Sequence, residues 1–310
     1  MSQIIKSIKT FNNNKKTTFK TSFKLKKNNE EFENEVEIEN ELAKIPNFKN
    51  FFVTIDNSNN LTFSNFKSNN IRDSKYKIIK YNTNKLFSIE LRINNYSGAK
   101  KIYFLITLIE SAFNTLYLMH NNNIIHNSIN LNSFLVCEND CFFLSNFSYS
   151  FKTNSPYDIA FISKGIIPKY YIEIFMLNNN LTHSNLTNIL SNLKEYFESS
   201  KLLSINECQN CIENYNLFYK KYINLNKKQI INDLNDLLFT WDIISFSFLI
   251  LYIIENYFSS IDQYTSIRNY FINLLSPPWN KKTCILHREF KELYLEISSS
   301  CWESLIKLNI

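Results

Sequence analysis

The chain has 310 residues, of which 45% are hydrophobic and 15% aromatic, so it can bury a sizeable core and is not a disordered polypeptide. Its formal net charge is +6, but no nucleic-acid motif or interleaved aromatic repeat accompanies this mild excess of lysine. Nucleic-acid binding is therefore not expected. Glycine occurs only twice, whereas asparagine, lysine, isoleucine and tyrosine are abundant, a bias typical of an A/T-rich genome.

The start of the chain, Met1–Lys6, is too polar for a secretory signal peptide. The longest apolar stretch, Ile243–Ile254, is interrupted by serines and is too short to cross a bilayer. We therefore expect a cytoplasmic or other intracellular protein without a membrane span, with its six cysteines reduced. Cys208 and Cys211 have the spacing of metal ligands, but no second such pair or nearby histidine completes a site, so no metal is expected.

In the N-terminal third, strands are predicted at 4–11 and 17–25, joined by a polar turn at 12–16. Asparagine can take the left-handed turn conformations that glycine usually supplies. The acidic segment Glu30–Leu42 is predicted to be a helix, because carboxylates favour a helix N-terminus. The lysines before this helix and the glutamates within it indicate charged solvent faces rather than a phosphate-binding patch.

Farther along the chain, two short apolar segments at 134–136 and 142–144 are predicted to form a β-hairpin with a polar turn at 137–141. Pro277 and Pro278 mark a break in the helical C-terminal part. Apolar residues at helical spacing predict helices at 189–197, 203–222, 243–254, 264–275, 288–297 and 301–308.

One stretch carries a recognisable pattern, His126-Asn127-Ser128 followed by Asn130 and Ser133. It resembles the catalytic loop of protein kinases, H-R-D-L-x-x-x-N, whose Asp is the catalytic base and whose Asn holds Mg²⁺. His126 takes the position of the His, Ser128 that of the Asp and Ser133 that of the Asn. Asn130 stands where the family commonly has a Lys. By this resemblance, the loop keeps the structural histidine of the family and lacks the carboxylate and carboxamide side chains that take part in catalysis.

Downstream motifs follow in the order that the kinase family uses. Asn146-Phe147-Ser148 lies 18 residues after Ser128, in the register of D-F-G, whose Asp binds Mg²⁺. Gly165–Glu173 resembles the end of an activation segment, with Glu173 at the final Glu of A-P-E.

Trp241–Tyr252 resembles the helix that anchors the second lobe of kinases. The resemblance implies that Asp242 accepts hydrogen bonds from the backbone around His126 and Asn127, which is a structural task. It also makes His126 and Phe147 core residues and not catalysts.

The N-terminal part matches the family more weakly. Lys24 resembles the lysine that pairs with ATP phosphates, and Glu35 resembles its partner on the following helix. Lys20 and Lys26 are alternatives to Lys24, and charged solvent faces without any such pair are an equal interpretation. The glycine-rich phosphate loop expected at 12–16 contains no glycine.

The resemblance implies an α+β, bilobed protein-kinase-like fold over residues 1–310. A small β-rich N-lobe covers 1–90, and a larger helical C-lobe covers 91–310 with a helical insertion at about 178–235. This insertion follows the substrate-facing segment and is either a partner-docking element or an expansion without a role.

Function is predicted from the groups that are missing at Ser128, Ser133 and Asn146. A serine hydroxyl does not accept a proton near neutral pH, and neutral oxygens are poor ligands for Mg²⁺. We expect a pseudokinase that acts as a scaffold or allosteric partner of an active kinase or its substrate, with weak ATP binding left open and Mg²⁺ binding not expected. Ser128 and Asn146 are expected to line an open cleft.

The alternative interpretation is a divergent ATP-dependent protein kinase that uses other carboxylates. Glu138, Asp140 and Asp158 are the candidates for that role.

Overall fold

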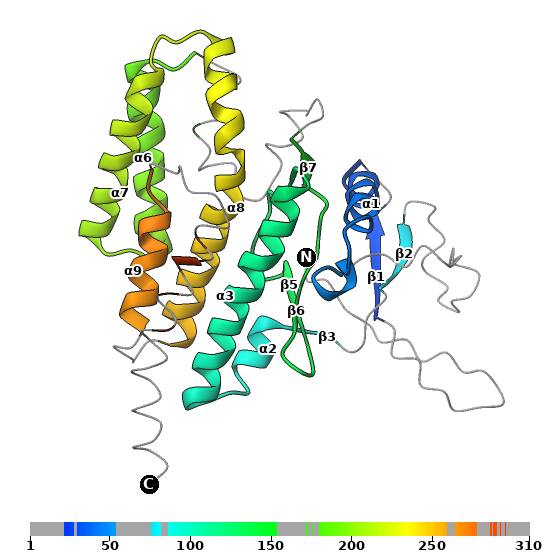
Figure 1. Cartoon of the computed structure of the whole chain (residues 1–310). Helices are drawn as coiled ribbons and strands as arrows, with labels where there is room; N and C mark the ends of the chain where they lie inside the picture. Colours follow the sequence, from blue (N-terminus) through cyan, green and yellow to red (C-terminus); the bar gives the residue numbers. More distant parts are fainter. Residues whose placement is uncertain are drawn as a thin grey trace, which may run out of the picture. The chain divides into compact units, whose positions relative to one another are not determined.

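The computed structural model describes residues 22–27, 30–53, 76–81, 86–153, 172, 176, 180–258, 264–277, 286, 288–289, 292 and 295. It is a mixed α+β structure in which helices predominate (Figure 1). The described residues divide into two compact units. The first lies within Met1–Asn95 and Leu131–Ser150, and the second within Tyr96–Asn130 and Phe151–Ile310.

In the first unit, strand β1 (Ser22–Lys27) pairs antiparallel with β2 (Tyr76–Tyr81). Helix α1 (Glu30–Leu42) has the bounds that the sequence predicts, with three glutamates in its first turn, where the helix dipole favours negative charge. The predicted strand 17–25 is confirmed where β1 overlaps it. The segments 4–11 and 12–16 lie outside the described residues.

A three-stranded antiparallel sheet completes the first unit, in the order β3 (Leu86–Ser88), β5 (Phe134–Cys137), β6 (Phe142–Leu144). The short helix α2 (Ile89–Ile93) follows β3 directly, and a single 3-10 turn, η1 (Phe48–Asn50), precedes a parallel bridge to β6. The predicted hairpin is therefore confirmed. Because β5 pairs with β3, the hairpin belongs to the first unit, together with the N-terminal residues.

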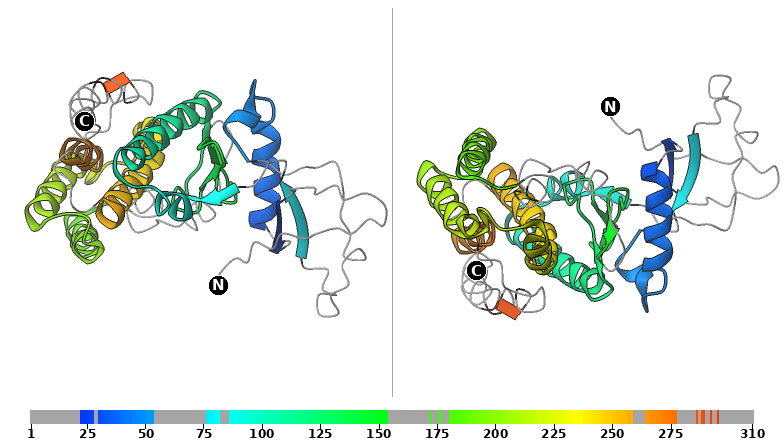
Figure 2. Two further views of the ribbon diagram at one scale, coloured as in Figure 1. Left: turned by 90° about the horizontal axis from the view of Figure 1, so that it is seen from below. Right: turned by 90° about the horizontal axis from the view of Figure 1, so that it is seen from above.

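The second unit contains a long helix, a pair of short strands and a bundle of further helices. Figures 1 and 2 show α6, α7, α8 and α9 side by side. The elements are α3 (Gly98–Asn121), β4 (Ile124–Ile125) paired with β7 (Phe151–Lys152), α6 (His183–Ser200), α7 (Ile205–Tyr219), η4 (Lys220–Tyr222), α8 (Lys227–Tyr257) and α9 (Thr265–Leu274).

Most helices predicted for this unit are confirmed. Their apolar residues recur at helical spacing, and capping residues stand where two of the helices begin. Ser204 and Glu207 form a capping box at the start of α7, and Asn226 forms another with Gln229 at the start of α8. The described residues within 288–297 are helical, and 301–308 lies outside the described part of the chain.

Aromatic contacts hold the helices of the second unit together. Phe113 of α3, Phe246 of α8 and Phe271 of α9 are fully buried, with ring centroids 5.6–6.3 Å apart. Phe197 of α6 stacks on Phe248 of α8 at 5.7 Å. Such ring pairs add about 0.5–1.5 kcal/mol each beyond the area they bury, so this cluster fixes the packing of α8 against its neighbours.

Two helices of the second unit have the length and apolar composition of a membrane span, Lys100–Asn121 and Leu237–Tyr257. Within the structure 89% of the most apolar window of the second helix is buried, compared with 56% for the first. Buried core helices have the same length and composition, so these two helices are weak evidence for a membrane-spanning protein.

Asparagine takes most of the left-handed backbone positions in the described residues. Such positions cost other L-residues about 1–2 kcal/mol, and asparagine tolerates them because its short polar side chain can bond locally. The five asparagines with φ between 58° and 70° are Asn47, Asn123, Asn127, Asn146 and Asn224.

Candidate functional site

The backbone of the loop that follows β4 is hydrogen-bonded to one carboxylate of α8. Asp242 is fully buried, and its Oδ2 accepts a hydrogen bond from the backbone N–H of His126 at 2.8 Å. Its Oδ1 accepts from the backbone N–H of Asn127 at 2.9 Å. These are the hydrogen bonds that the sequence analysis expects for Asp242, between residues more than 100 positions apart.

A histidine that sequence reasoning missed completes this anchor. His120, in the last turn of α3, places its Nε2 3.1 Å from Asp242 Oδ2, while its ring packs against Phe239 of α8 at 4.9 Å. The buried carboxylate therefore faces three nitrogen groups, which together offset the cost of burying it. Its role is to fix the loop backbone, and nothing in this geometry exposes it to a substrate.

Within the loop, the serine that the resemblance aligns with the catalytic Asp is buried. Ser128 has no exposed surface, its backbone N–H donates to His126 Nδ1 at 3.3 Å, and its carbonyl oxygen accepts from Asn130 Nδ2 at 2.9 Å. The expectation that Ser128 lines an open cleft is therefore wrong. The physical reason is that Asp242 holds the preceding residues His126 and Asn127 inside the protein and that Ile129, which follows Ser128, is buried as well.

Ser133 also lies inside the protein, as part of the first unit. It is fully buried, and its carbonyl oxygen accepts from Ser145 N at 2.8 Å and from Ser145 Oγ at 3.0 Å. This double contact joins the two ends of the β5–β6 hairpin, so the described backbone contacts of Ser133 are structural.

The segment in the D-F-G register is held by helix α1 of the same unit. The side-chain amide of Asn34 donates to the carbonyl oxygens of Ser148 and Ser150 at 3.0 and 2.8 Å, and Ser148 Oγ donates to Glu35 Oε2 at 3.1 Å. Phe147 is fully buried and packs edge-to-face on Phe52 at 6.0 Å. The structure thus brings Glu35 together with this segment, through contacts that the sequence analysis did not foresee.

The residues expected to hold a nucleotide are placed only in part. Asn146, at φ 70°, is partly exposed beside Phe147 and adopts a conformation that suits Asn or Gly. Lys24 and Lys26 lie on β1, but their side chains are outside the described part of the structure, as are Lys20 and Glu173. A Lys24–Glu35 pair therefore stays a prediction.

Of the carboxylates considered for an alternative chemistry, one has a structural role. Asp140 Oδ1 accepts from Arg92 Nη2 at 2.6 Å and from Arg92 Nε at 3.0 Å, while Arg92 Nη2 also donates to the Glu138 carbonyl oxygen at 2.6 Å. Arg92 thereby clamps the turn of the hairpin to α2. Asp158 lies outside the described residues.

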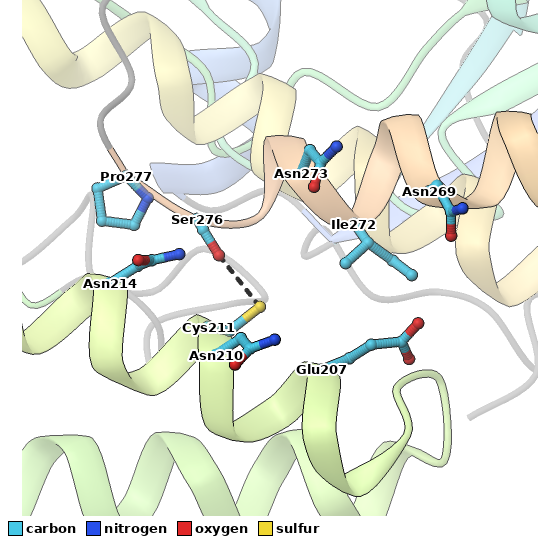
Figure 3. A pocket seen from close by; sticks show the side chains of 9 residues that line it. All are labelled: Glu207, Asn210, Cys211, Asn214, Asn269, Ile272, Asn273, Ser276 and Pro277. Carbon is cyan, nitrogen blue, oxygen red and sulfur yellow. Dashed lines mark hydrogen bonds between the residues drawn. The ribbon is translucent and has the colours of Figure 1, made fainter.

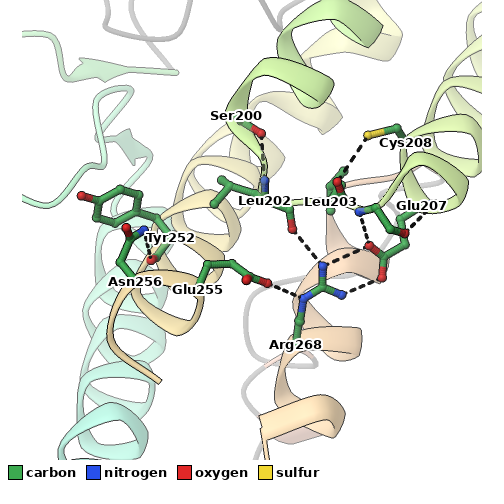
Figure 4. A network of polar contacts seen from close by, with 10 residues as sticks. Ser200, Leu202, Leu203, Glu207, Cys208, Tyr252, Glu255, Asn256 and Arg268 are labelled. Carbon is green, nitrogen blue, oxygen red and sulfur yellow. Dashed lines mark hydrogen bonds and ion pairs between the residues drawn. The ribbon is translucent and has the colours of Figure 1, made fainter. Parts of the chain in front are cut away.

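A separate cavity of about 450 Å³ opens between α7 and α9 of the second unit (Figure 3). Arg268 of α9 stands at one end of it, bound to both carboxylate oxygens of Glu207 at 2.6 and 3.0 Å, to Glu255 of α8 at 2.8 Å and to the carbonyl oxygen of Leu202 at 2.9 Å (Figure 4). No cluster of metal-ligating side chains occurs among the described residues.

The anchors missed by sequence reasoning share one property. Asn34, Arg92, His120 and Arg268 each bond to groups that are distant along the chain, and no local periodicity marks them. A comparison with protein-family models finds no match for this chain, and a comparison with curated proteins finds none either.

Proposed function

We propose that the chain is an inactive relative of protein kinases, with a bilobed fold, that acts inside the cell as a scaffold or allosteric partner of an active kinase or its substrate. The observation that carries this proposal is the Asp242 anchor. Its two carboxylate oxygens bind consecutive backbone N–H groups of His126 and Asn127, as the resemblance requires.

A second line of support comes from the first unit. The resemblance makes Phe147 a core residue, and Phe147 is fully buried, while the neighbouring Ser148 donates to Glu35 Oε2 at 3.1 Å. This contact joins two motifs whose residues are 113 positions apart.

The chemistry of the degenerate positions argues against catalysis. Phosphoryl transfer needs a positioned base and Mg²⁺ to offset the developing charge. Ser128 offers a hydroxyl in place of the base, and its burial keeps substrate from it. Ser133 and Asn146 offer neutral oxygens in place of the amide and carboxylate that hold Mg²⁺.

The first test compares phosphate transfer from radiolabelled ATP in wild type and in Ser128→Ala. We expect no incorporation into the protein or into generic peptide substrates in either case. Incorporation lost in Ser128→Ala would overturn the proposal of inactivity. Incorporation that survives in Ser128→Ala and disappears in Asp140→Asn or Asp158→Asn would establish the alternative, a divergent kinase.

The second test addresses the register by restoring the family residue at Asn146, which is partly exposed, whereas Ser128 and Ser133 are fully buried. The variant Asn146→Asp should gain a rise in melting temperature that requires ATP and Mg²⁺ together, whereas wild type should show no Mg²⁺-dependent rise. Mg²⁺-dependent stabilisation of wild type would contradict the proposal. If ATP stabilises wild type without Mg²⁺, Lys24→Met should remove that effect.

A further inference from the structure

The turn of the β5–β6 hairpin is closed by two cysteines. The backbone N–H of Cys137 donates to the carbonyl oxygen of Cys141 at 3.0 Å, and the N–H of Asp140 donates to the carbonyl oxygen of Cys137 at 3.1 Å. Asp140 has the left-handed conformation, with φ at 57°. A three-residue loop that ends in a left-handed residue is a common hairpin connection and fixes the register of the two strands. The two cysteines therefore stand directly opposite each other.

Both thiols lie on the accessible face of the hairpin. Residues directly opposite on antiparallel strands point to the same side, so the two cysteines share a face with Leu135 and Phe143, which are half-buried. Cys141 is exposed, Cys137 is half-buried, and both are free thiols. The residues that are buried on the opposite face are Phe134, Val136, Phe142 and Leu144. A small reagent can therefore reach the pair without opening the core.

The two thiols are also in contact. Burial raises the pKa of the Cys141 thiol, the neighbouring Cys137 raises it further through its charge and a side-chain hydrogen bond, and Asp140 adds a smaller effect. Cys141 is therefore a neutral thiol near pH 7, hydrogen-bonded to the other member of the pair.

The backbone spacing suits a covalent bond between the two sulfurs. In a hydrogen-bonded antiparallel pair the Cα atoms are about 5.5 Å apart, within the range of about 4.4–6.8 Å that a disulfide spans. The Cβ atoms of directly opposite residues are about 4.5–5.5 Å apart, compared with about 3.5–4.5 Å in a disulfide. Formation of the bond therefore requires a movement of about 1 Å and leaves mild strain in the hairpin.

We propose that Cys137 and Cys141 form a reversible redox site, which a low-molecular-weight disulfide such as oxidised glutathione converts from a dithiol into an intramolecular disulfide. One cysteine loses its proton and its thiolate attacks the oxidant, so that a protein–glutathione disulfide forms and one glutathione leaves as a thiolate. The other cysteine, also deprotonated, then attacks the bonded protein sulfur and releases the second glutathione. In total the protein loses two electrons and two protons, which the oxidant takes up as two thiols.

The surroundings of the pair favour a reversible bond over a structural one. The bond would close a loop of only five residues, so it would restrict the unfolded chain little. It would also be accessible and mildly strained, and such disulfides have the higher reduction potentials of labile or regulatory bonds. In a reducing compartment the pair therefore stays a dithiol and is oxidised only transiently. The proposal does not depend on the kinase-like assignment.

The test is incubation of the folded full chain with oxidised glutathione at about pH 8.5, where more of each thiol is in the reactive thiolate form. Free thiols are then alkylated with N-ethylmaleimide in denaturant, and the chain is cleaved after lysine and arginine. One product, the peptide 102–152, contains both cysteines of the pair and none of the other four. Mass spectrometry should find it doubly alkylated before oxidation. After oxidation it should be unalkylated and lack two hydrogen atoms, and an excess of reduced glutathione should restore the first state.

Single variants test whether the two thiols react with each other. Cys137→Ser and Cys141→Ser cannot complete the second step, so each should accumulate a glutathione adduct on the remaining cysteine, whereas wild type should not. Cys208 and Cys211 of α7 are the matched control pair, because both are buried and both lie in the separate peptide 202–220. They should remain fully alkylated after the same treatment. Circular dichroism should show that the oxidised protein and both variants are folded.

Four results would overturn the proposal. The first is a doubly alkylated peptide 102–152 after oxidation of the wild type. The second is a glutathione adduct that persists in wild type, because the two thiols would then not meet. The third is a disulfide that excess reduced glutathione does not remove. The fourth is equal oxidation of Cys208 and Cys211, because the reaction would then depend on unfolding and not on the hairpin.

Discussion

Removing the carboxylate of Asp242 should destabilise the second unit strongly. In Asp242→Ala the backbone N–H groups of His126 and Asn127 lose their acceptor inside the protein, and water has no access to replace it. A buried donor without a partner costs about 1–3 kcal/mol, so the two together cost about 2–6 kcal/mol. At about 2–4 °C per kcal/mol for a unit of this size, a central value of about 4 kcal/mol lowers the melting temperature by roughly 8–16 °C.

Two variants calibrate this expectation. Asp242→Asn keeps one acceptor oxygen and turns the other into a donor, so about half of the loss should remain. Ser247→Ala, on the same helix, removes a buried hydroxyl that bonds only one turn back, to the Ile243 carbonyl at 2.8 Å, and should cost about 1 kcal/mol.

Calorimetry measures the melting temperatures, and amide hydrogen exchange locates the effect. The amides of His126 and Asn127 should exchange slowly in wild type and quickly in Asp242→Ala. The amides of Val53 and Leu144 in the first unit, which bond to Leu144 and Phe51 at 2.9 and 2.8 Å, should keep their protection. A melting temperature within about 1 °C of wild type for Asp242→Ala, or rapid exchange of both loop amides in wild type, would refute the register of residues 126–242.

Three further predictions concern other anchors. Because the folded-state pKa of Glu207 is lowered from 4.5 to about 2, its contribution to stability is complete above about pH 4.5 and is lost as the pH falls toward 2. Full conversion would give roughly 3 kcal/mol, but a side chain that is 25% exposed is screened by solvent, so a loss of about 1–2 kcal/mol is expected. Arg268→Ala should reduce this pH dependence in urea denaturation and leave the smaller part that comes from the hydrogen bonds of Ser204 to Glu207. Asn34→Ala should lower the free energy of unfolding by about 1–3 kcal/mol and make the Ser148–Ser150 segment more susceptible to proteolysis, because its carbonyl oxygens lose the amide donor. Unchanged proteolysis of that segment would contradict this expectation. Asn123→Gly should be neutral within about 0.5 kcal/mol, whereas Asn123→Ala should cost about 1 kcal/mol; equal effects in thermal melts would count against the left-handed turn.

Local patterns predicted the acidic helix α1 and the β5–β6 hairpin, because an acidic first turn and two apolar segments around a polar turn are distinct signals. They predicted only residues 243–254 of α8 and gave no prediction for α3, whose apolar residues were not recognised as a helix. The Asp242 contact could be predicted because a motif register, and not periodicity, connects it with residues 126–127.

The rest depends on contacts that no local signal contains. Asn34 meets Ser148 across 114 positions, and a polar residue on an acidic helix reads equally well as a solvent-facing one. The burial of Ser128 follows from how the loop is covered, which its sequence does not specify. The grouping of the hairpin with the N-terminal residues follows from its pairing with β3, a strand of three residues that is too short to stand out.

The use of asparagine at left-handed turns has a consequence for the unfolded chain. Glycine gives an unfolded polypeptide its largest freedom, and replacing it by another residue lowers that entropy by about 0.4–1 kcal/mol where the fold accepts the change. A chain that makes these turns with asparagine at φ 58–70° therefore loses less entropy on folding, at the cost of mild backbone strain in the native state. Its unfolded ensemble should be stiffer than that of a glycine-rich chain of equal length, and its turns should already favour bent conformations before the strands and helices they join are formed.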